Sequence, residues 1–178
     1  MPSGSLRVSD VKVLKKVKDV VQIHVPAVCV LILFSSMFAQ VLLRYVFRHP
    51  SPEAFEISSY SFVWSVLLGA ALANRYKNHI KFDIIYNKFP RKVQIVTDIV
   101  FDLFFSTLLI ISLKPIVSQA LWYRIIRSEV LGIPWTYLAL CLPIAMVLMI
   151  IDNFRFIFLN LRELVFRKPY KMEERPWR

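Results

Sequence analysis

Two pairs of ionisable residues have the four-residue spacing that places side chains on one face of a helix. His79 and Asp83 could ligate a metal, but no second histidine or cysteine lies nearby, so we expect no metal. Asp98 and Asp102 could relay protons or bind a cation, because carboxylates inside a membrane are functional candidates. They lie close to the predicted membrane edge, so pairing with basic neighbours is the simpler interpretation. With Arg75, these four residues form a predicted polar cluster at the cytoplasmic edge.

A second group of charged residues precedes a long apolar run. Glu53 and Glu56 are three apart and share a face if this segment is helical, and Arg48 lies just before them. The glutamates could bind a basic surface on a partner, and they would also interact favourably with the dipole of the helix that follows. Arg48 could attract an anion or act as an interfacial anchor. We keep these three residues as candidates for docking a partner.

The apolar run at 57–73 contains no charged residue. Small residues recur in it at every fourth position: Ser61, Ser65, Gly69 and Ala73. A ribbon of small side chains lets two membrane helices approach closely. We therefore predict that this ribbon, together with the neighbouring Trp64, packs against another helix of this chain or of a second subunit.

These residues must be positioned by membrane helices. The chain has 178 residues, of which 57% are hydrophobic, and its mean hydropathy is +0.54. A soluble domain would be less apolar. The hydrophobic residues gather in blocks long enough to cross a bilayer. We predict an all-α membrane protein with a basic segment at 1–24, a basic tail at 159–178, and four spans at about 25–47, 57–74, 93–113 and 135–158.

The segments around the spans leave several alternatives open. The 1–24 segment is either an amphipathic helix on the membrane surface or an extension of the first span, and part of 75–92 is predicted to lie at the interface. Pro115 ends or kinks the third span. The residues at 116–134 are then an interfacial helix and loop, or a continuation of that span. Pro143 is expected to kink the fourth span.

The distribution of basic residues predicts the topology. When Arg44 and Arg155, at the ends of spans, are counted with the segments that follow them, 18 of the 23 Lys and Arg residues belong to the two tails and the connection between the second and third spans, and 5 belong to the other two connections. The positive-inside rule therefore places both termini and the middle connection in the cytoplasm. The same distribution accounts for the net charge of +11, so no nucleic-acid partner is needed to explain it.

Several function classes are disfavoured by what the sequence lacks. We find no Gly-rich phosphate loop, no nucleophile–base pair and no paired histidines within the spans, so we expect neither an enzyme nor a bound cofactor. The chain has only 3 glycines and no visible inverted repeat, whereas carriers commonly use broken helices. Cys29 and Cys141 lie in separate apolar blocks and are expected to remain free thiols.

The stretch from 44 to 83 resembles the small membrane subunit (DctQ-like) of tripartite ATP-independent periplasmic, or TRAP, transporters. The matching positions are Arg44, Tyr45, Glu56, Phe62, Val63, Trp64, Leu68, Gly69, Ala70, Ala71, Arg75, His79, Ile80 and Asp83. An insert from Glu53 to Phe55 departs from the pattern and leaves open which glutamate takes the family's role. The rest of the chain agrees with the family in hydropathy, length and predicted topology.

The resemblance implies a function that composition alone does not give. It implies a non-catalytic subunit in the bacterial inner membrane that holds a large, DctM-like transport subunit. It also implies that the pair docks a soluble, DctP-like periplasmic binding protein for sodium-coupled uptake of an organic acid, such as a dicarboxylate, keto acid or sialic acid. The alternatives are a self-contained small carrier and the membrane anchor of an enzyme complex.

Overall fold

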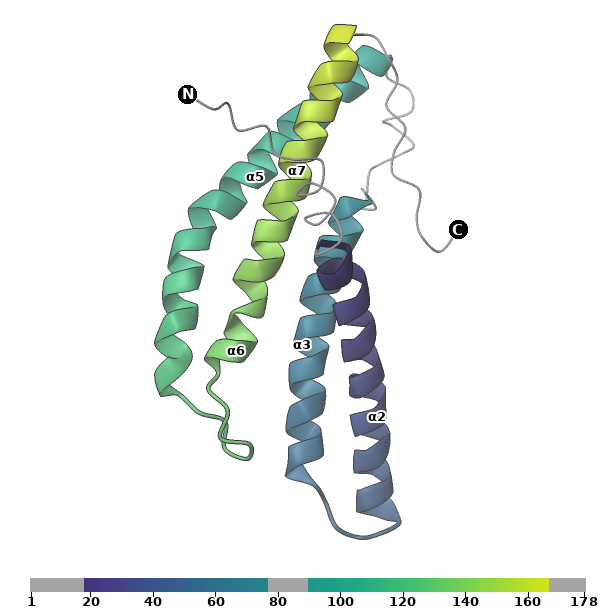
Figure 1. Cartoon of the computed structure of the whole chain (residues 1–178), viewed down its shortest axis with the longest axis vertical. Coiled ribbons are helices and arrows are strands. Elements are labelled where there is room, and N and C mark those ends of the chain that lie inside the picture. Colours follow the sequence, from purple (N-terminus) through teal and green to yellow (C-terminus); the bar gives the residue numbers. More distant parts are fainter. Residues whose placement is uncertain (1–17, 77–89, 167–178) are drawn as a thin grey trace, which may run out of the picture. The chain divides into compact units, whose positions relative to one another are not determined.

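The computed structural model describes residues 18–76 and 90–166. Within these ranges the regular structure is helical, apart from one isolated antiparallel bridge between Arg127 and Pro134. The elements in chain order are η1 (Val20–His24), α2 (Val25–Tyr45), α3 (Pro52–Arg75), α5 (Arg91–Trp122), η2 (Tyr123–Ile125), α6 (Thr136–Ala139) and α7 (Cys141–Phe166). They divide into two compact units, one holding residues up to Gly69 plus Ser128–Ile133, and the other holding the rest (Figure 1).

The first unit begins with a helix that is already formed when the first predicted span starts. Residues from Lys18 onward are helical, and the π-helical turn η1 runs directly into α2. Pro26 lies in the first turn of α2, where its missing N–H is tolerated. The described part of the 1–24 segment therefore extends the first span, while residues 1–17 lie outside the described ranges.

The second span begins earlier than the apolar run that predicted it. Helix α3 starts at Pro52, a residue whose fixed φ suits the first helical position. The Ser51 hydroxyl accepts a hydrogen bond from the N–H of Ala54 at 3.4 Å, as an N-terminal cap does. The polar residues from Pro52 to Glu56 are therefore helical, and they lengthen the short span at 57–74 at its start.

In the second unit, α5 and α7 pack against each other along their lengths (Figure 1). Helix α5 continues through Pro115 to Trp122. Residues 116–122 therefore continue the third span, which was one of the two alternatives for 116–134. The 3-10 turn η2 and a loop follow. Ile95, Ser106 and Ala120 are buried along α5, and their spacing marks one face of the helix.

The fourth span is interrupted where Pro143 predicts it. The short helix α6 ends at Ala139, and α7 begins at Cys141. A proline ring clashes with the carbonyl group four residues earlier, which for Pro143 is that of Ala139. The expected kink is therefore confirmed as a break at Leu140.

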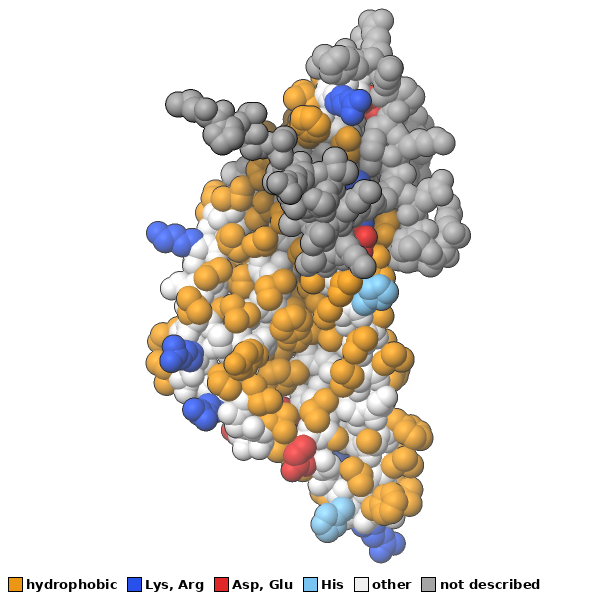
Figure 2. Space-filling model, in the orientation of Figure 1, with side chains coloured by type: hydrophobic (Ala, Val, Ile, Leu, Met, Phe, Trp, Pro, Cys, Tyr) orange, Lys and Arg blue, Asp and Glu red, His pale blue; other side chains and the backbone are white. Residues whose placement is uncertain are grey.

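The fold class is confirmed as an all-α membrane protein. Four helical segments are long and apolar enough to cross a bilayer: Val20–Tyr45, Pro52–Arg75, Val93–Ile125 and Thr136–Leu164. Hydrophobic side chains cover most of the visible face of the described helices (Figure 2). Cys29 is half-buried on α2 and Cys141 is buried at the start of α7.

Candidate functional site

The first turn of α3 holds Glu53 in an exposed position. The Ser51 hydroxyl donates a hydrogen bond to Glu53 Oε2 at 2.8 Å, and both groups lie at the protein surface. This carboxylate therefore stabilises α3, because a negative charge near the N-terminus of a helix interacts favourably with the helix dipole. It also stays accessible to a soluble partner, so the two roles weighed for the glutamates are compatible at Glu53.

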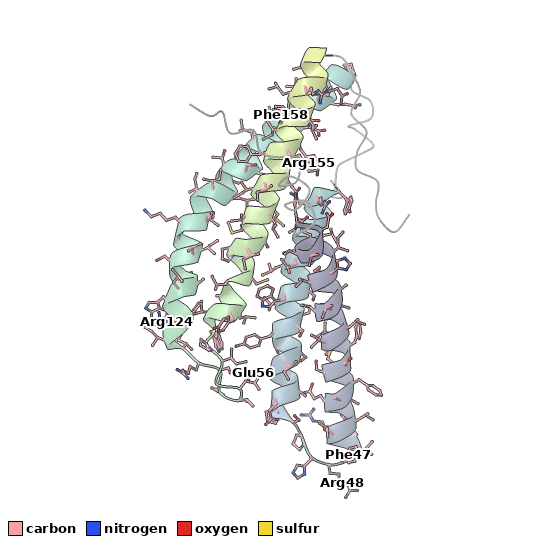
Figure 3. The ribbon with its side chains drawn as sticks, in the orientation of Figure 1. Phe47, Arg48, Glu56, Arg124, Arg155 and Phe158 are labelled. Carbon is pink, nitrogen blue, oxygen red and sulfur yellow. The ribbon has the colours of Figure 1, made fainter. Side chains whose placement is uncertain are left out.

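Glu56 differs from Glu53 because it is half-buried and already has a partner. Its Oε2 atom accepts a hydrogen bond from the backbone N–H of Leu131 at 2.8 Å, across 75 residues of sequence. Both residues belong to the first unit, and Glu56 is labelled on α3 in Figure 3. A hydrogen bond to an ionised carboxylate is stronger than one between neutral groups. Glu56 therefore connects α3 to the loop that follows η2.

The tip of that loop, residues 128–133, is closed by its own hydrogen bonds. The N–H of Ser128 donates to the carbonyl oxygen of Ile133 at 2.9 Å, and the N–H of Ile133 donates to Ser128 Oγ at 3.2 Å. Gly132 has a φ of +65°, a value that glycine adopts without a side-chain clash. We call residues 128–133 the loop tip.

Behind the loop tip lie two polar groups of limited exposure. The Ser128 side chain is buried. The buried Tyr60 hydroxyl lies beside Ser128 and within electrostatic reach of Glu56. In contrast, Glu129, Val130 and Ile133 are exposed. The loop tip therefore turns a polar side toward α3 and presents one acidic and two aliphatic side chains to its surroundings.

Arg48, the third docking candidate, lies in the loop between α2 and α3 and is exposed (Figure 3). Its φ of 52° is in the left-handed region, which is uncommon for a residue other than glycine. The chain reverses direction there, and the N–H of His49 donates to the carbonyl oxygen of Leu43 at 2.9 Å. Arg48 is thus part of the turn that ends α2.

The ribbon of small residues is partly covered. Ser61 is buried, while Trp64, Ser65, Gly69 and Ala73 are half-buried. A side chain added at Gly69 would meet no atom of this chain within 4 Å among the residues described. The fully buried positions of α3 are instead Leu68 and Ala71. The close helix contact predicted for Gly69, with another helix of this chain or with a second subunit, therefore stays a prediction.

The far end of α3 contains a polar pair that sequence reasoning missed. The Nδ2 atom of Asn74 donates to Asn153 Oδ1 of α7 at 2.9 Å, and also approaches the carbonyl oxygen of Met149 at 3.5 Å. Asn74 and Asn153 are both buried, and Asp152 beside Asn153 is fully buried. The consecutive polar residues 152 and 153 inside an apolar run were the available signal, because buried polar side chains need partners.

The structure describes three of the five residues of the predicted polar cluster. Arg75 is buried, and its guanidinium carbon lies 5.8 Å from the centroid of the Tyr76 ring. Asp98 and Asp102 are half-buried on α5, on the face that also carries Ser106, whose hydroxyl donates to the Asp102 carbonyl oxygen. His79 and Asp83 lie outside the described residues. Within the described ranges, no three His, Cys, Asp or Glu residues form a group that could hold a metal.

Comparison with known proteins finds a family model that matches most of the described chain and relatives that match part of it. The sequence model of the family described as "Tripartite ATP-independent periplasmic transporters, DctQ component" matches residues 20–165. A C4-dicarboxylate TRAP transporter small permease protein DctQ from Vibrio cholerae is 32% identical over 94 residues, covering 49% of this chain and 40% of the relative. A putative TRAP transporter small permease protein from Haemophilus influenzae is 34% identical over 67 residues, covering 38% of this chain and 42% of the relative. Each alignment thus spans less than half of the relative's length.

Proposed function

Because the chain belongs to the DctQ component family of TRAP transporters, we propose that it is the small membrane subunit that scaffolds a large, DctM-like transport subunit and helps a DctP-like periplasmic binding protein to dock. The family match over residues 20–165 carries this proposal. The family is one of transporter subunits in the inner membrane and not of catalytic enzymes. The expectations of a membrane location and of a non-enzyme therefore agree with the family.

The surface of α2 supports a scaffolding role. Only 6% of the most apolar stretch of the span Val20–Tyr45 is buried. Large side chains such as Leu31, Phe34 and Phe38 are each about two-thirds exposed. Lipid can cover such a surface, and so can another membrane subunit that matches its shape. A helix that makes few contacts within its own chain suits a protein whose role is to hold a partner.

The orientation of the chain is part of the proposal. The 18-to-5 division of basic residues supports cytoplasmic termini, and four spans return the chain to the side on which it began. The loop tip and the first turn of α3 then face the periplasm, where a binding protein would approach. Cysteine labelling in intact cells tests this: a residue placed after position 167 should resist a periplasmic reagent, and labelling there would reverse the assignment.

The substrate class rests on the relatives and on the family resemblance. The Vibrio cholerae relative is named for C4-dicarboxylate transport. We therefore propose sodium-coupled uptake of an organic acid, with a dicarboxylate as the first substrate to test, followed by keto acids and sialic acids.

Co-purification tests the scaffolding role directly. The chain, carrying an affinity tag and extracted in mild detergent from its own cells, should retain a large multi-span transport protein in stable stoichiometry. Retention of a soluble or membrane-bound enzyme in its place would favour the enzyme-anchor alternative. Recovery of the chain alone, combined with transport by the chain alone, would favour a self-contained carrier.

A further inference from the structure

We propose that Glu56 is a positioning residue: it accepts a hydrogen bond from the Leu131 backbone and thereby fixes the loop tip as part of the surface that docks the binding protein. This inference rests on the proposed function for the identity of the partner. The hydrogen bond between Glu56 and the loop tip lies within the first unit and does not depend on that identity. It also gives the two neighbouring glutamates separate roles, since Glu53 remains an exposed charge.

The hydrogen-bonding pattern of the loop tip shows why one acceptor matters. Its internal bonds join Ser128 to Ile133 and close the loop on itself. The bond from the Leu131 N–H to Glu56 joins it to α3. A closed loop without an external bond can move as a body, because surface loops have few packing contacts to restrain them. The Glu56 carboxylate therefore restrains the loop tip from outside.

The exposed groups of the loop tip indicate the chemistry of the partner surface. Glu129 is exposed, as is Glu53 in the same unit, while Val130 and Ile133 are 43% and 36% exposed. Two accessible carboxylates favour a basic surface on the partner. Two aliphatic side chains offer it a small apolar contact. A soluble protein with a basic rim around an apolar patch matches these groups, and a loop held in one conformation loses less entropy on binding.

The proposal requires an acceptor at position 56, and the carboxylate charge strengthens the bond without being essential to it. A glutamine keeps a side-chain oxygen at the same distance from the backbone, whereas an alanine removes it. If Glu56 acted as a docking charge, glutamine and alanine would fail equally. If it positions the loop tip, Glu56→Gln should resemble the parent, and Glu56→Ala should not.

The first measurement is amide hydrogen exchange on the full chain in detergent, read at Leu131. Glu56→Ala should speed exchange at Leu131 by roughly tenfold or more, because a hydrogen bond to a charged acceptor is lost. Glu56→Gln should stay close to the parent, and the amides of α5 and α7 should not change in either variant. Ser59→Ala is the matched control, since the Ser59 hydroxyl is exposed and bonds only to Phe55 of its own helix.

The second measurement is uptake by liposomes that contain the complete transporter, recorded against binding-protein concentration. Glu56→Ala should raise the half-saturating concentration several-fold and leave the rate at saturation near the parent's, while Glu56→Gln changes neither. Equal loss in both variants with unchanged Leu131 exchange would overturn the proposal in favour of a docking charge. Faster exchange with an unchanged uptake curve would also overturn it, since the loop tip would then lie outside the docking surface. If uptake by the parent transporter did not depend on the binding protein, the proposed function would be overturned. The hydrogen-exchange measurement would still test the Glu56–Leu131 hydrogen bond.

Discussion

The two ends of α3 use polar residues in opposite ways. At its start, Glu53 and Ser51 form a hydrogen bond at the surface, where water and salt weaken electrostatic effects. At its end, Asn74 and Asn153 form a hydrogen bond that is covered on all sides, and an unmade bond there has no water to replace it. The same helix therefore has one end suited to meeting a partner from solution and one end fixed within its own chain.

The largest effect is expected at the apolar positions between the two ends. Leu68 is fully buried, so Leu68→Ala should lower the free energy of unfolding of the isolated chain by about 2–5 kcal/mol. Gly69→Leu should leave that free energy nearly unchanged, because nothing described lies within 4 Å of the new side chain. Thermal unfolding in detergent measures both variants.

Gly69→Leu should instead weaken assembly with the large subunit, because overpacking a close helix contact typically costs about 1–3 kcal/mol. Co-purification yield, compared with that of the parent, measures this. Normal assembly and transport by Gly69→Leu would show that the ribbon of small residues faces lipid and not a subunit.

A smaller effect is expected at the buried amide pair. Asn153→Leu leaves the Asn74 amide without its side-chain acceptor, and we expect destabilisation of about 1–2 kcal/mol, the range of hydrogen bonds between membrane helices in model peptides. The double variant with Asn74→Leu should lose less than the two single variants combined, because removing both partners leaves no unmade bond.

Asn160→Leu is the matched control for the amide pair. It changes the same residue type on the same helix, but the buried Asn160 Nδ2 has no hydrogen-bond partner among the described residues. Asn160→Leu should therefore be neutral or stabilising in the same unfolding assay. If Asn153→Leu were as stable as Asn160→Leu, the Asn74–Asn153 hydrogen bond would not fix the end of α3 within its own chain.

The smallest effect is expected at the exposed start of α3. Glu53→Lys reverses an accessible charge, which should slow encounter with a basic partner surface at low ionic strength. Uptake at limiting binding protein should fall a few-fold, and raising the salt concentration should shrink the difference, because salt screens exposed charges. An uptake curve that does not change at either ionic strength would make Glu53 a helix-end charge alone.

Much of the fold could be predicted from the sequence because each span is continuous in hydropathy. Pro143 placed the break in the fourth span correctly, since its steric clash is local. The sequence left open whether the third span ends at Pro115 or continues beyond it, and helix α5 continues to Trp122. A membrane helix tolerates an internal proline when other groups satisfy the freed carbonyl, and that tolerance is not visible in the sequence.

The site was less predictable because its contacts join distant parts of the chain. Glu56 was found from its spacing to Glu53, but its bond to Leu131 spans 75 residues, and no local pattern encodes such a contact. The Asn74–Asn153 bond spans 79 residues and was missed for the same reason. The ribbon at Gly69 was predicted from a four-residue period, whereas the fully buried positions of α3 are Leu68 and Ala71. The spacing of small residues alone does not show which face of a membrane helix packs against other helices of the same chain.

Reconstitution in liposomes shows whether this chain transports alone or only together with its partners. Liposomes should be prepared with this chain alone, with its large partner alone, and with both, each with and without the soluble binding protein and a sodium gradient. We expect uptake of an organic acid only when both membrane subunits and the binding protein are present. Uptake by liposomes that contain this chain alone would contradict this expectation and make the chain a carrier in its own right.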